Sequence, residues 1–116
     1  MTKLAVLIAR EEGFFRSGTL PQRQNNPGDL RHSPHSQHPG DPNAIGAIDT
    51  PEHGWGDLER QLQIDAGRGL TLRQAIYSWA PPSENDTAQY LQFVMDGFGG
   101  LVDGETPLSQ VLLIQA

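Results

Sequence analysis

Two adjacent glutamates, Glu11 and Glu12, follow a short apolar stretch at the start of the chain. Burial against apolar surface keeps a carboxyl group protonated, and a protonated carboxyl beside a leaving oxygen is what cleavage of a glycosidic bond requires. Both residues flank the apolar face on a helical wheel, so spacing alone does not choose between them. An ordinary solvated acid pair would produce the same pattern.

Histidines form the second group of residues whose side chains are suited to chemistry. His32, His35 and His38 are spaced by three, and His53 follows further along. Imidazoles at such spacing bind a metal ion if a turn or helix brings them together. Proline and serine between them favour extended backbone, so a polar loop with incidental histidines is the preferred interpretation. We expect residues 32–43 to be the most mobile part of the chain and to hold no tightly bound metal.

Ring and amide side chains are the third group. Trp55, Trp79 and Tyr90 have the flat rings that stack on sugars, although each also falls on an expected core stripe, and a core role is favoured for both tryptophans. Asn26 has a short amide that fits an N-acetyl group. Its alternative role is a turn residue before Pro27.

The elements that must position these residues are mostly helical. Apolar spacing predicts a helix over residues 3–15, with Thr2 as its cap. Residues 16–44 are rich in proline, glycine and asparagine and predict a long loop region, followed by a short strand at 45–48. Further helices are expected from Thr-Pro-Glu at 50–52 to Gly67, from the Thr71/Gln74 capping box to Pro81, from Ser83 or Asn85 to Gly99, and after Thr106-Pro107.

These signals predict a mainly α single domain over residues 1–116, with about five helices, a Pro/Gly-rich insert and at most a small β element near 44–50. The chain has no cysteine, which excludes disulfides and thiolate metal sites. Its net charge is −6, and all eight basic residues lie at or before Arg73. Without a basic stripe, nucleic-acid binding is not expected. No apolar run is long enough to span a membrane.

Three segments resemble a known superfamily. Residues 8–14 (IAREEGF) resemble the first-helix motif of phage endolysins, in which glycine follows the general-acid glutamate, and residues 12–15 resemble the Glu-Ser-x-Phe motif of bacterial lytic transglycosylases. Residues 25–31 (NNPGDLR) are similar to the Asn-Pro-Gly-Asn segment of phage-borne lysozyme-like proteins. Residues 79–87 (WAPPSENDT), with Tyr90, stand where transglycosylases carry Glu-Thr-x-x-Tyr.

The resemblance implies a lysozyme-like fold that cleaves the MurNAc–GlcNAc bond of peptidoglycan without a cofactor. It favours Glu12 over Glu11 as general acid, because the glutamate directly before glycine is the matching one. It implies that Tyr90 lines the glycan cleft. A virion or bacterial cytoplasmic location is expected, with export by a route that needs no signal peptide, and other virion or secretion-apparatus proteins are possible partners.

The sequence departs from these families in two places. Pro21 stands where T4-type endolysins have an aspartate, and the Gly-Leu-Met-Gln motif of transglycosylases is absent. Single-acid transglycosylase chemistry fits better than two-carboxylate hydrolysis, with Asp29 or Asp49 left as candidates for a second carboxylate. The alternatives are a non-catalytic phage structural or glycan-binding protein of the same fold, and a metal-binding module built on the histidines.

Overall fold

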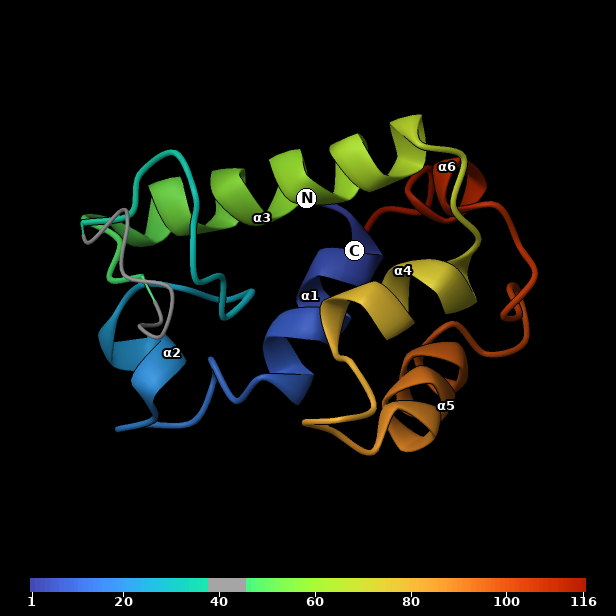
Figure 1. Ribbon diagram of the computed structural model, residues 1–116, viewed down its shortest axis with the longest axis horizontal. Coiled ribbons are helices and arrows are strands. Elements are labelled where there is room, and N and C mark those ends of the chain that lie inside the picture. The colour runs from blue at the N-terminus through green and yellow to red at the C-terminus, as the bar shows by residue number, and fades with distance from the viewer. Residues whose placement is uncertain (38–45) are drawn as a thin grey trace. The chain divides into compact units, whose positions relative to one another are not determined.

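A computed structural model describes residues 1–37 and 46–116 (Figure 1). These residues form six α-helices and no sheet, with only isolated β-bridges, which confirms the mainly α expectation. Residues 38–45 lie outside the described part, and with them His38, much of the expected mobile segment and the start of the expected strand. The helices are α1 (Lys3–Glu11), α2 (Leu20–Arg23), α3 (Pro51–Gly67), α4 (Leu72–Trp79), α5 (Thr87–Gly97) and α6 (Leu108–Val111).

Helix α1 begins as expected but ends earlier than the apolar spacing predicts. The hydroxyl of Thr2 accepts a hydrogen bond from the Ala5 N–H at 3.2 Å, which caps the first turn. The helix ends at Glu11 because Gly13 turns the chain with a φ of 84°, a conformation that glycine adopts without steric cost. The prediction of a helix to residue 15 was wrong, and the correction places Glu12 in the turn that follows α1.

Helix α2 lies inside the segment that was expected to be a loop. Thr19 is its cap, with a side chain that accepts a hydrogen bond from the Gln22 N–H. Pro21 sits in the first turn, where the missing N–H of proline costs nothing. The Thr-x-Pro pattern at 19–21 was therefore a helix start within a proline-rich segment.

Helix α3, the longest, runs from Pro51 to Gly67 as predicted. Gly54 faces inward on its first turns, and a Cβ placed there would collide with the main-chain oxygen of Asn25 and lie 2.9 Å from Pro27. The absence of a side chain at Gly54 thus lets α3 pack directly against the turn at residues 25–27.

Of the last three helices, only α4 follows its cap signal, because α6 begins at Leu108 after Pro107 and has no side-chain cap hydrogen bond. Thr71 and Gln74 form the expected capping box at the start of α4. Helix α5 is capped by Asp86, which accepts a hydrogen bond from the Gln89 N–H, instead of by Ser83 or Asn85. Asp86 is the residue directly before the first helical turn, the position from which a side chain reaches the free N–H groups.

The chain divides into two compact units. The middle unit is Ile8–Gln61, and the terminal unit combines Met1–Leu7 with Leu62–Ala116. Ile8, Ile48 and Leu58 are buried in the middle unit, while the buried residues of the terminal unit include Leu4, Leu72, Ile76, Val94, Phe98 and Leu108. The sequence-based expectation of a single domain stays a prediction.

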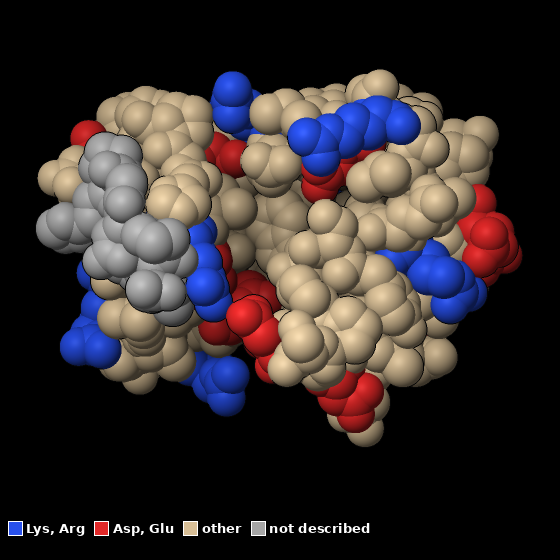
Figure 2. Space-filling model, in the orientation of Figure 1, with Lys and Arg blue, Asp and Glu red and all other residues tan. Residues whose placement is uncertain are grey.

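The described surface carries few basic groups. On the face drawn in Figure 2 the lysine and arginine side chains lie in separate places and do not form a stripe. Among the described residues, no helix has the combined length and apolar character needed to cross a membrane.

Candidate active site

The turn at residues 26–30 is held from inside by the side chain of Asn26, which is completely buried. Its Oδ1 accepts a hydrogen bond from the Leu30 N–H at 2.9 Å. Its Nδ2 donates to the main-chain oxygens of Leu30 at 2.7 Å and Gly46 at 2.9 Å. Because the amide is committed to the main chain on both sides, the structure gives Asn26 the turn-forming role.

Asp29 belongs to this turn and has a left-handed backbone with a φ of 52°. Its carboxyl group is hydrogen-bonded to the side chain of Glu12. Burial raises the pKa of the Asp29 carboxyl, although the hydrogen bond with Glu12 and the positive charge of Arg31 both oppose the rise. Two carboxyl groups share a hydrogen bond only when one of them carries a proton, and the burial that raises the pKa of Asp29 favours the protonated form of that carboxyl group.

Glu12 and Glu11 are distinguished by their surroundings. Glu12 is half-buried in the turn after α1, and its main-chain N–H donates to the oxygen of Ile8 at 2.9 Å. Glu11 is exposed; partial desolvation raises the pKa of its carboxyl, and the charge of Arg16 opposes that rise. Of the two, Glu12 is the one bonded to a second carboxyl group.

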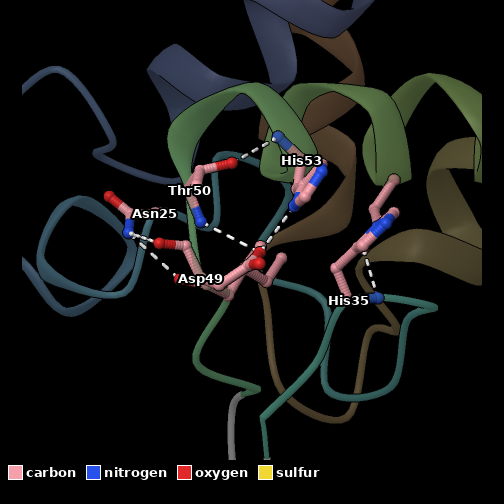
Figure 3. A network of polar contacts seen from close by, with 7 residues as sticks. Asn25, His35, Asp49, Thr50 and His53 are labelled. Atoms are coloured by element: carbon pink, nitrogen blue, oxygen red, sulfur yellow. Dashed lines mark hydrogen bonds and ion pairs between the residues drawn. The ribbon is translucent and has the colours of Figure 1, made fainter.

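Asp49, the other candidate second carboxylate, directly precedes Thr50, whose hydroxyl caps α3 by accepting a hydrogen bond from the His53 N–H at 3.1 Å (Figure 3). The Oδ1 of Asp49 accepts the Thr50 N–H at 3.0 Å and lies 2.7 Å from the Nδ1 of His53. The hydrogen bond with His53 is the main reason that the pKa of the Asp49 carboxyl is lowered. The Asp49 carboxylate is exposed and contacts the start of α3, whereas the carboxyl group of Asp29 contacts Glu12.

His35 and His53 stack face to face, with ring centroids 3.9 Å apart. The Nδ1 of His35 lies 2.6 Å from Asp57, whose side chain is 3% exposed, and the main-chain N–H of His35 donates to the same carboxylate at 3.0 Å. Burial is the largest single influence on Asp57 and acts to raise its pKa, but the hydrogen bonds with His35 and Ser33 and the charge of His35 together lower it.

Sequence reasoning missed Asp57 as the partner of His35, the histidine that stacks on His53. The signal available was its position four residues after His53, which places both side chains on the same side of a helix. His32 is exposed. Among the described residues, no three histidine, aspartate or glutamate side chains are grouped as a metal site.

The aromatic candidates fall into both units. Trp55 is half-buried in the middle unit and packs edge-on against Phe14, with ring centroids 5.4 Å apart. Trp79 is half-buried on α4, and Tyr90 is 4% exposed on α5, so both belong to the terminal unit. The structure thus joins Glu12 with Asp29 in the middle unit and places Tyr90 in the core of the terminal unit.

No protein-family model matches the sequence, and comparison with curated proteins and with solved structures also gives no match. The geometry of the carboxyl pair therefore carries the functional proposal.

Proposed function

We propose that this protein is a lysozyme-like lytic transglycosylase that cleaves the MurNAc–GlcNAc bond of peptidoglycan, with Glu12 as general acid and then base. The observation that carries the proposal is the hydrogen bond between the half-buried Glu12 and Asp29. A general acid must hold a proton at the pH of the reaction, and the burial that raises the pKa of Asp29 acts in the turn that Glu12 contacts.

The closeness of the two carboxyl groups favours one-acid chemistry. Two-carboxylate glycosidases separate these groups by about 5–9.5 Å, so that a sugar or a water molecule fits between them. Glu12 and Asp29 are in direct hydrogen-bond contact, which leaves no such gap. Asp29 is therefore suited to hold and orient Glu12, and we assign the nucleophile to the substrate.

The sugar's own 6-hydroxyl supplies that nucleophile. Glu12 gives its proton to the glycosidic oxygen as the bond to the anomeric carbon breaks, and the 6-hydroxyl oxygen bonds to that carbon. The Glu12 carboxylate takes the hydroxyl proton, so the acid is regenerated and no water is consumed. The products are a free GlcNAc end and a 1,6-anhydro-MurNAc end.

The test is mass spectrometry of purified peptidoglycan digested by the full chain. We expect fragments that end in 1,6-anhydro-MurNAc, each lighter by one water than the hydrolysed fragment. Fragments with reducing MurNAc ends would replace this mechanism by hydrolysis. Intact peptidoglycan after prolonged digestion would overturn the proposed activity.

A non-catalytic glycan-binding protein is the second candidate. It is favoured by two residues that the enzyme would direct at its substrate: the amide of Asn26, a candidate for binding an N-acetyl group, is committed to its turn, and Tyr90, which the resemblance places at the cleft, is 4% exposed. Co-sedimentation with insoluble peptidoglycan in the absence of any released fragment would support this alternative.

Asp29→Asn is expected to change how stability depends on pH. Burial raises the pKa of the Asp29 carboxyl in the folded protein above its unfolded value of about 3.9. The contribution of the Asp29 carboxyl group to the free energy of unfolding is therefore complete below about pH 3.9, and it is lost as the pH rises through the pKa of the folded protein. Asparagine stays neutral and tolerates a left-handed backbone, so the variant should gain stability relative to wild type as the pH rises. Urea unfolding at a series of pH values measures this difference.

Asp49→Asn is the matched control, since the pKa of Asp49 is lowered. The contribution of this carboxylate is present above about pH 3.9 and is lost as the pH falls through the lowered pKa. The variant should thus be less stable than wild type at neutral pH, and the difference should vanish on acidification. The same pH trend in both variants would contradict the burial of Asp29.

A further inference from the structure

Three aromatic side chains in the middle unit form one cluster beside the turn that carries Glu12. Phe14 contacts Phe15 edge-on at a centroid distance of 5.5 Å, and Trp55 lies 5.4 Å from Phe14 and 6.0 Å from Phe15. Phe15 is nevertheless 56% exposed. The cluster therefore holds the Phe15 ring in place from one side while it leaves much of that ring open to solvent.

An arginine lies next to this cluster. The Arg16 N–H donates to the main-chain oxygen of Gly13 at 3.0 Å, which folds residues 13–16 into a tight turn. A Cβ on Gly13 would lie 2.9 Å from the Nη2 atom of Arg16, so glycine at this position makes room for the guanidinium against the main chain. The guanidinium is thereby brought to the residue that directly follows Glu12.

We propose that Phe14, Phe15, Arg16 and Trp55, here called the aromatic–arginine surface, bind the MurNAc residue on one side of the bond that is cleaved. This inference rests on the proposed function. Apolar faces of sugar rings stack on aromatic rings, and the guanidinium pairs with a carboxylate through charge-assisted hydrogen bonds. MurNAc offers both features, because it is a pyranose ring with a lactyl group that ends in a carboxylate or continues into the stem peptide. GlcNAc offers only the ring.

The distance along the chain suits this role. Arg16 and Phe15 are within four residues of Glu12, so their main-chain positions lie within about 15 Å of it even for an extended chain, and the turn brings them nearer. Glu11 competes for the same guanidinium, as its electrostatic interaction with Arg16 shows. Glu11 is exposed, so solvent weakens that interaction, and a ligand carboxylate can displace it.

The test compares two soluble glycans by calorimetry, with Glu12→Gln as the background so that neither is cleaved. One is a GlcNAc–MurNAc tetrasaccharide with free lactyl carboxylates, and the other is chitotetraose, which has no carboxylate. Arg16→Gln should weaken binding of the MurNAc glycan about tenfold, as loss of a charged hydrogen bond does, and change chitotetraose affinity less than about twofold. Phe15→Ala should weaken both glycans, by roughly three- to tenfold.

Arg23→Gln removes another exposed arginine of the middle unit and should leave both affinities unchanged. Equal losses for both glycans in Arg16→Gln would overturn carboxylate recognition. Unchanged affinities in Phe15→Ala would overturn the surface as a sugar site. If the Glu12→Gln protein binds neither glycan and wild type does not cleave peptidoglycan, both the proposed function and this inference are overturned. If wild type cleaves peptidoglycan but Arg16→Gln and Phe15→Ala bind both glycans with unchanged affinity, this inference is overturned and the proposed function stands.

Discussion

Replacement of Glu12 by glutamine is expected to reduce cleavage of purified peptidoglycan by about 10²–10⁴-fold, the usual contribution of general acid–base catalysis. Glutamine keeps the shape of the side chain, and its amide still donates a hydrogen bond to Asp29, but it has no proton to transfer to the glycosidic oxygen. Release of soluble fragments over time measures the loss. The fold should survive, because glutamine fills the same volume in the half-buried position after α1 and keeps a donor for Asp29.

Glu11→Gln is the matched control for this prediction. Glu11 is the neighbouring residue with the same side chain, but it is exposed, and the charge of Arg16 acts on its carboxyl group. We expect its turnover rate to stay within a few-fold of wild type. Equal losses in the two variants would show that both glutamates act together, and full activity in Glu12→Gln would remove Glu12 from the mechanism.

The sequence predicted where most helices begin, because those signals are local. Thr71 with Gln74, and Pro51 after Thr50, act through hydrogen bonds or backbone angles within one helical turn. Helix ends were harder to predict. Apolar spacing continues to Phe15, but the left-handed turn at Gly13 stops α1 first. Helix α2 was missed because the prolines and glycines around it favour a loop assignment.

The candidate site shows the limit of sequence reasoning more sharply. Glu12 was favoured by the glycine after it, which is a local pattern. Asp29 and Asp49 had equal standing as a second carboxylate, since nothing in their neighbours says which one reaches Glu12. That choice depends on the three hydrogen bonds of Asn26, which hold the turn of Asp29, and on Gly46, which is far along the chain. Long-range hydrogen bonds of this kind leave no periodic signal.

Gly54→Ala is expected to destabilise the protein by about 3 kcal/mol or more, at the upper end of the cost of overpacking. The added methyl group would collide with the main-chain oxygen of Asn25 and press on Pro27. Neither is the end of a flexible side chain, so the start of α3 would have to move away from the turn. That turn also holds Asp29, so we expect cleavage of peptidoglycan to fall together with the stability.

Gly56→Ala provides the control on the same helix. Gly56 is exposed, and a Cβ there meets nothing within 4 Å. Alanine in a helix interior is better than glycine by about 0.5–1 kcal/mol, because glycine loses more backbone freedom on folding. Urea unfolding followed by circular dichroism should therefore shift in opposite directions for the two variants. A Gly54→Ala protein as stable as wild type would mean that α3 does not approach the Asn25 turn closely. The packing of α3 would then no longer explain how the turn holds Asp29 beside Glu12.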